Sequence, residues 1–146
     1  MQRAVYDAIH AALIEARPTQ VISGMALGVD QIAVRITLAL SIPLVAAVPF
    51  PGQEAPWPPS SRDDYTGILS QATRVVFVAQ PPYAAWKLQR RNEWMVDRAD
   101  VVWAVWDGSP TGGTANAISY AERQSKPVRN LWSDVQRRLG TEPGHA

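Results

Sequence analysis

The segment 42–50, IPLVAAVPF, constrains the fold more than any other part of the chain. It is an unbroken apolar run, and the segment before it carries Ile32, Ile36 and Leu40 at helical spacing. A short continuous apolar run bounded by turn residues is typical of a strand buried on both faces of a parallel sheet. We therefore predict an α/β domain built on such a sheet.

The same alternation of apolar runs and helical segments continues along the chain. Further strands are predicted at 19–24, 74–79, 100–108 and 127–132, and helices at 4–16, 28–40, 61–72, 85–98 and 114–124. This order predicts a single Rossmann-like domain, a mostly parallel sheet with helices on both faces. The proline-rich segment 51–60 is too short for a domain linker. We assign residues 1–139 to the domain and 140–146 to a flexible tail.

Composition excludes several classes of function. The 146 residues contain no cysteine, which excludes disulfides, thiolate metal sites and cysteine nucleophiles. The formal net charge is +1, so charge gives no reason to expect nucleic acid or an anionic membrane as a partner. No apolar stretch is long enough to span a bilayer, and the first residues resemble an amphipathic helix rather than a signal peptide. We expect a cytoplasmic protein without a metal site.

Two glycine-containing turns are the best candidates for a binding site. SGMALGVDQ (23–31) and WDGSPTGGT (106–114) each follow a predicted strand and lead into a helix. The carboxyl ends of parallel strands share one edge of the sheet, where α/β proteins bind ligands. Glycines allow close approach of a ligand, and free N–H groups at a helix start favour anions. Each turn alone is more simply a turn with a helix cap; together they make phosphate binding an equally good interpretation.

Known phosphate motifs are absent from the chain. No lysine follows Gly112 and Gly113, so the P-loop is missing, and Gly24 and Gly28 do not form a dinucleotide-binding G-x-G-x-x-G. Arg91 precedes Asn92 in a predicted helix that leads directly into the strand at 100–108. An arginine at such a position is more often part of a solvated helix face, but here it is also a candidate for a bidentate phosphate contact. Among the tryptophans, Trp57 in the proline-rich loop is the one that we expect to face a ligand.

Several motifs in the same order give the chain a family resemblance. VISGMALGVDQIA (21–33) resembles the S-G-x-A-x-G-x-D-x-x-A signature of the DprA–LOG (SLOG) superfamily, and 91–128 resembles the second half of that domain. PFPGQ with Trp57, then DDYTGIL, RVVFVA and Tyr83, is similar to the YpsA-like branch. The resemblance covers about 110 residues, from Val21 to Val128.

The resemblance implies a nucleotide or nucleotide-derived ligand, either a nucleoside monophosphate or an ADP-ribose or NAD-related compound, bound by a module that could act as a sensor. It implies no other cofactor. The residues that it assigns to the ligand and its phosphate are Gly24, Met25, Gly28, Asp30, Phe50, Gln53, Trp57, Arg91, Asn92, Asp107, Gly112, Gly113, Thr114 and Asn116.

Two departures from the family pattern leave alternatives open. LOG enzymes, which cleave a nucleotide into base and ribose phosphate, carry a glutamate where this chain has Ala117. A nucleotide N-glycosidase that uses Asp30 or Glu93 instead is one alternative; DprA-like single-stranded DNA binding and a ligand-free structural member are others. The chain also opens on a helix, without the strand that is central in related sheets. We therefore predict that the sheet closes up or that a second copy covers the gap, which makes a homodimer.

Overall fold

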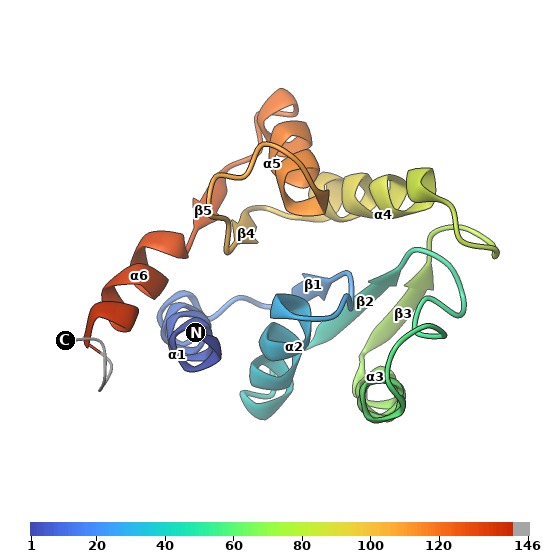
Figure 1. Ribbon diagram of the computed structural model, residues 1–146, viewed down its shortest axis with the longest axis horizontal. Coiled ribbons are helices and arrows are strands. Elements are labelled where there is room, and N and C mark those ends of the chain that lie inside the picture. Colours follow the sequence, from blue (N-terminus) through green and yellow to red (C-terminus); the bar gives the residue numbers. More distant parts are fainter. Residues whose placement is uncertain (142–146) are drawn as a thin grey trace.

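The computed structural model describes residues 1–141, in which helices and short strands alternate along the chain (Figure 1). The helices are α1 (Gln2–Ala16), α2 (Val29–Ala39), α3 (Pro59–Gln71), α4 (Ala85–Arg98), α5 (Gly113–Arg123) and α6 (Trp132–Thr141). The strands are β1 (Val21–Ser23), β2 (Leu44–Val48), β3 (Arg74–Phe77), β4 (Val102–Ala104) and β5 (Val128–Asn130). The α/β prediction is confirmed, and every strand lies within a segment predicted as one.

Strand β2 is the centre of the larger sheet. It pairs in parallel with β1, Val21 opposite Leu44, and with β3, Phe77 opposite Val48. All five residues of β2 are buried. Figure 1 shows why: α4 and α5 lie on one side of the strands, and α1, α2 and α3 on the other. The continuous apolar run thus forms the doubly covered strand that its sequence predicts.

Strands β4 and β5 form a separate parallel sheet in the described part of the chain. Their register places Val102 opposite Val128, and no ladder joins β4 to β1. The edge of β1 away from β2 and the edge of β4 away from β5 are therefore both open. Our expectation that the sheet closes up is wrong: no ladder joins the two sheets, and apolar packing of α1, α2 and α6 with Trp103 of β4 connects them instead.

Apolar packing nevertheless joins the two sheets. One core cluster combines α1 residues such as Ala8 with Ile36 of α2 and Val135 of α6, and Trp103 of β4 packs against it. A second cluster under the larger sheet contains Met25, Leu44 and Tyr65 among others. Helix α1 consequently contacts both α2 and α6, and it covers the side of the molecule where the sheets are separate (Figure 1).

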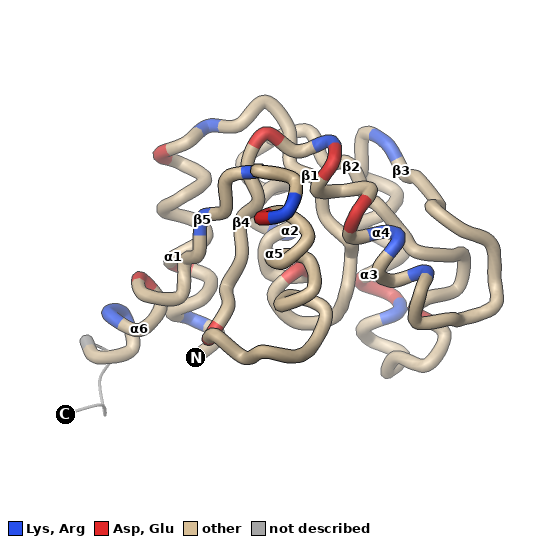
Figure 2. The backbone as a smooth tube through the Cα atoms, turned by 90° about the horizontal axis from the view of Figure 1, so that it is seen from above, with Lys and Arg blue, Asp and Glu red and all other residues tan. Residues whose placement is uncertain are grey.

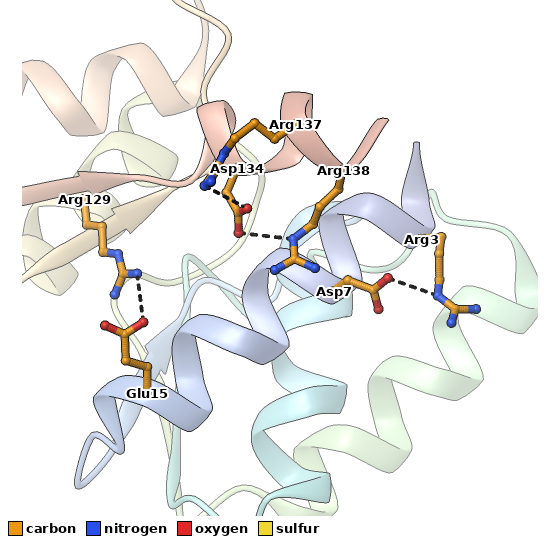
Figure 3. A network of polar contacts seen from close by, with 7 residues as sticks. All are labelled: Arg3, Asp7, Glu15, Arg129, Asp134, Arg137 and Arg138. Atoms are coloured by element: carbon orange, nitrogen blue, oxygen red, sulfur yellow. Dashed lines mark hydrogen bonds and ion pairs between the residues drawn. The ribbon is translucent and has the colours of Figure 1, made fainter. Parts of the chain in front are cut away.

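Helix α6 was not predicted from the sequence. Its ten residues are WSDVQRRLGT. Val135 is buried in the core, and Trp132 and Leu139 pack against the same cluster, so the apolar residues do recur at helical spacing. It includes Gly140 and Thr141 of the predicted tail; residues 142–146 lie outside the described residues. Figure 3 shows its charged face, where Asp134 accepts from Arg137 at 3.0 Å and from Arg138 at 3.2 Å.

The surface carries charges of both signs. Figure 2 shows Lys and Arg dispersed among Asp and Glu along most of the chain. One ion pair, between Arg129 and Glu15 at 4.0 Å, connects β5 with α1, and being exposed it contributes at most about 1 kcal/mol. Across residues 1–141, no helix has both the length and the apolar character needed to cross a membrane.

Candidate functional site

The first glycine turn is held by its own polar side chains. Ser23 Oγ accepts the Met25 N–H at 3.1 Å, and the Asp30 carboxylate accepts the Ala26 N–H at 3.0 Å. Met25 is fully buried with a left-handed φ of 60°, and Gly28, with a φ of 88°, is the N-cap of α2. The predicted residues Met25, Gly28 and Asp30 therefore give the turn its shape.

Gly24 makes room for Arg91. A Cβ built on Gly24 would lie 2.6 Å from Arg91 Nη1, closer than real contacts allow. The guanidinium donates through Nη1 to Gly24 O at 2.6 Å and to Ala47 O at 3.5 Å, and the residue is only 7% exposed. Arg91, from α4, thus joins the carboxyl ends of β1 and β2 beneath the turn.

Asp30 and Arg91 influence one another electrostatically at this turn. Burial raises the pKa of the Asp30 carboxyl, while the hydrogen bond from Ala26 and the charge of Arg91 act in the opposite direction. Burial likewise lowers the pKa of the Arg91 guanidinium, and the charge of Asp30 opposes this shift. Each group therefore compensates part of the cost of burying the other.

The second glycine turn ends in a helix start with unused donors. Gly112, with a φ of 105°, is the N-cap of α5 and provides no side-chain cap. The first intrahelical bond is donated by Asn116 to Gly112 O at 3.0 Å, so the N–H groups of residues 113–115 precede it. Before the turn, the Asp107 carboxylate accepts the Ser109 N–H at 3.0 Å, and hydrogen bonds from the Ser109 side chain and backbone lower its pKa.

Helix α4 links the two glycine turns. Arg91 binds the first turn, and it also donates from Nε to Asn92 Oδ1 at 3.0 Å. Asn92 in turn donates to Gly113 O at 3.4 Å, in the second turn. Two turns that lie about 90 residues apart in the sequence are thereby fixed relative to one another by adjacent side chains of one helix.

A hollow of about 370 Å³ lies at the second turn. It contains four predicted residues, Asp107, Gly112, Gly113 and Thr114, and it is bordered by Val29 at the start of α2. The remaining lining comes from Met1, Val5, Val105, Trp106, Ser109, Thr111 and Trp132. Among the described residues of α2 and of the first glycine turn, only Val29 lines this hollow.

Other predicted residues lie elsewhere. Gln53 Nε2 donates to Gly24 O at 3.3 Å, on the far side of the first turn. Trp57 meets Tyr65 edge to face with ring centroids 5.2 Å apart, and Phe50 is buried against Tyr83. Asn116 lines a separate shallow hollow with Gln89, Ser119 and Arg123. These residues support the turns or lie beside them; none of the four lines the hollow at Gly112.

Sequence reasoning missed the aromatic wall of this hollow. Trp106 lies two residues after the end of β4 and Trp132 is the first residue of α6, whereas from the sequence we predict a ligand contact for Trp57 alone among the tryptophans. Asn130 Oδ1 accepts the N–H groups of Trp106 at 3.0 Å and Trp132 at 3.1 Å, and Asn130 Nδ2 donates to Trp106 O at 2.9 Å. The position of Trp106 at a strand end was the available clue. No cluster of three metal-ligating side chains occurs in residues 1–141.

Parallel strands flanked by helices, with two glycine turns at the strand ends, define a Rossmann-like domain. Residues 2–134 match the model of the YspA SLOG family, so the chain belongs to this family and the predicted resemblance is confirmed.

Related proteins come from several bacteria. The SPbeta prophage-derived protein YoqJ of Bacillus subtilis is 30% identical over 118 residues, which is 70% of this chain and 68% of YoqJ. A UPF0398 protein of Brevibacillus brevis is 33% identical over 100 residues, 62% of this chain and 53% of the relative. Another UPF0398 protein, from Halalkalibacterium halodurans, is 27% identical over 132 residues, which is 86% of this chain and 69% of the relative. The chain thus spans about half to two thirds of these relatives.

Proposed function

We propose that the protein binds a nucleotide or nucleotide-derived ligand, a nucleoside monophosphate or an ADP-ribose or NAD-related compound, at the carboxyl ends of its strands. The observation behind the proposal is a hollow at the start of α5, which is lined by Gly112, Gly113 and Thr114. The first N–H groups of this 11-residue helix have no side-chain cap, and a helix N-terminus favours a phosphate.

The glycines leave room for that phosphate. A Cβ built on Gly112 or on Gly113 would meet no atom within 4 Å, so the backbone is open to a ligand. Asp107 lines the same hollow, and its carboxylate would repel a phosphate at close range. We therefore assign Asp107 to the ribose hydroxyls, which donate hydrogen bonds to a carboxylate, and the α5 start to the phosphate.

The positions of the candidate catalytic carboxylates favour ligand binding over hydrolysis. Ala117 stands where LOG enzymes have a glutamate. Asp30 accepts the Ala26 N–H within the first turn, and Glu93 accepts from Gln89 Nε2 at 3.2 Å. Neither of these lines the hollow. We propose a binding module, with the N-glycosidase activity as the alternative that incubation with AMP and analysis for free adenine would reveal.

The open strand edges support a dimer as part of this proposal. Both β1 and β4 lack a partner on the sides away from β2 and β5 in the described chain. Unpaired edges attract further backbone, and a second copy of the chain is the partner always present at equal concentration.

The test compares two substitutions at one glycine. Gly113 is the first residue of α5, where proline fits the helix but lacks the N–H group. Gly113→Pro removes one phosphate donor, whereas Gly113→Ala keeps it and serves as the matched control. Loss of one hydrogen bond to a charged group costs about 1.5–3 kcal/mol, so AMP binding by calorimetry should weaken about 10- to 100-fold in Gly113→Pro relative to Gly113→Ala.

Two outcomes would overturn the proposal. One is equal AMP affinity of the two variants, which would exclude the α5 N–H groups as the phosphate site. The other is the absence of binding of AMP, ADP-ribose and NAD by the unmodified protein, together with no nucleotide released from it on mass spectrometry after denaturation.

A further inference from the structure

One asparagine side chain forms hydrogen bonds with the backbone of two tryptophans that line the hollow. Asn130, the last residue of β5, accepts the backbone N–H of Trp106 and of Trp132 on the same oxygen, at 3.0 and 3.1 Å. Its Nδ2 donates back to Trp106 O at 2.9 Å. Three hydrogen bonds from one side chain therefore fix the backbone at both tryptophans, which are distant in sequence.

The indole of Trp106 is held as well. Its Nε1–H donates to Ser109 O at 2.9 Å, within the loop that leads to the second glycine turn. The indole thus has its only donor satisfied by the protein and offers a ligand its apolar face. Both tryptophans are partly exposed, and both line the hollow.

The lining of the hollow therefore combines two kinds of chemistry. Gly112, Gly113 and Thr114 offer backbone donors, whereas Val5, Val29 and Val105 are apolar lining residues, together with Trp106 and Trp132. A sugar phosphate alone would leave these apolar groups in contact with water. A planar aromatic base would cover them, because bases stack on aromatic side chains.

We propose that Trp106 and Trp132 bind the aromatic base of the ligand and that Asn130 is the residue that positions them. This proposal rests on the proposed function and adds to it that the ligand is a nucleotide with an intact base, not a base-free ribose phosphate. The base covers the indole faces, the ribose hydroxyls lie toward Asp107, and the phosphate lies at α5.

The experiment compares AMP with ribose 5-phosphate, which share the phosphate and differ in the base. The unmodified protein should bind AMP about tenfold more tightly than ribose 5-phosphate, within the range measured for base–aromatic stacking. Trp106→Leu should reduce AMP affinity to that of ribose 5-phosphate and leave ribose 5-phosphate binding unchanged. Trp86→Leu, at a tryptophan 58% exposed on α4 and outside the hollow, is the matched control and should bind AMP normally.

Asn130 is tested through a readout that a purely structural role would not move. Asn130→Ala should lower AMP affinity and leave ribose 5-phosphate affinity unchanged, with unfolding followed separately by circular dichroism. Because Trp132 packs partly against the core, Trp132→Phe is the variant for that position: it keeps a smaller aromatic face and should lose only part of the AMP preference.

The outcomes separate this inference from the proposed function. Equal affinity of the unmodified protein for AMP and ribose 5-phosphate overturns the role of the tryptophans and leaves phosphate binding at α5 standing. Equal loss of both ligands in Trp106→Leu and Asn130→Ala also overturns it, because the tryptophans would then act on the site as a whole. Failure of AMP, ADP-ribose, NAD and ribose 5-phosphate to bind the unmodified protein, with no nucleotide released from it on denaturation, overturns the proposed function and this inference together.

Discussion

The contact between Gly24 and Arg91 makes a sharp prediction about stability. In Gly24→Ala, the new Cβ would lie 2.6 Å from Arg91 Nη1 and 2.8 Å from Cζ, whereas ordinary contact begins at 3.4 Å. The guanidinium cannot swing away freely, because it is 7% exposed and is bonded to Gly24 O, Ala47 O and Asn92 Oδ1. The substitution must therefore displace the guanidinium and lengthen the 2.6 Å bond to Gly24 O.

The magnitude follows from these two effects. Overpacking a well-filled interior costs about 1–3 kcal/mol, and loss of a hydrogen bond to a charged group costs about 1.5–3 kcal/mol. Because the side chain can relieve part of the clash by giving up that bond, the two are not fully additive. We expect Gly24→Ala to lower the free energy of unfolding by about 2–4 kcal/mol.

Urea denaturation followed by circular dichroism measures this change. The matched control is Gly67→Ala, in the interior of α3, where a Cβ meets no atom within 4 Å and alanine should stabilise by up to about 1 kcal/mol. In an Arg91→Lys background, whose head group is smaller, the cost of Gly24→Ala should fall by at least about 1 kcal/mol. A Gly24→Ala cost below about 0.5 kcal/mol, or an equal cost in both backgrounds, would refute the assignment of Gly24 as the space for Arg91.

Three further predictions concern the turn and the assembly. Ser23→Ala removes the buried acceptor of the Met25 N–H and should lower the free energy of unfolding by about 1–3 kcal/mol in the same denaturation assay. The control Ser60→Ala, at an exposed position, should leave it unchanged. An unchanged free energy of unfolding in Ser23→Ala would contradict this role of Ser23. Because burial raises the pKa of Asp30, the folded protein holds that proton more tightly than the unfolded chain, so the contribution of Asp30 to stability is largest near and below about pH 4 and decreases as the pH rises through the raised pKa. Asp30→Asn should make the denaturation midpoint less dependent on pH over this range. An unchanged pH dependence would exclude Asp30 as the group responsible for it. Light scattering after size-exclusion chromatography should give twice the mass of one chain, and a monomer at all concentrations would exclude the dimer.

The elements that could be predicted from the sequence are those whose own residues carry a clear pattern. The run LVAAV of β2 has no polar position, so it had to be a doubly covered strand, and all five residues are buried. Glycine turns after strands predicted where α2 and α5 begin, and the hollow at the start of α5 is also lined by Val29, the first residue of α2. Helix α6 lies outside the elements that we predict, although its Trp132, Val135 and Leu139 recur at helical spacing and pack on the core. In a helix of only ten residues, packing against α1 supplies the stability that propensity lacks.

Long-range contacts were beyond sequence reasoning for a different reason. Arg91 and Gly24 lie 67 positions apart, and nothing in either segment specifies that the glycine accommodates the guanidinium. The same holds for Asn130, which binds Trp106 across 24 positions by joining the end of β5 to the end of β4. Such contacts follow from strand order and register, and the absence of a ladder between β1 and β4 affects both.

The predicted phosphate-binding groups differ in whether they are already hydrogen-bonded within the protein. For Arg91 to bind a phosphate, its guanidinium would have to leave Gly24 O and Ala47 O, and buried carbonyls without donors cost about 1–3 kcal/mol each. The N–H groups at the start of α5 require no such loss, since no side chain caps them. Phosphate binding at α5 is therefore favoured energetically, and Arg91 with Asn92 contributes by holding the first turn against the second. A ligand that spans both turns should consequently protect the Gly24 amide from hydrogen exchange, although that glycine does not line the hollow.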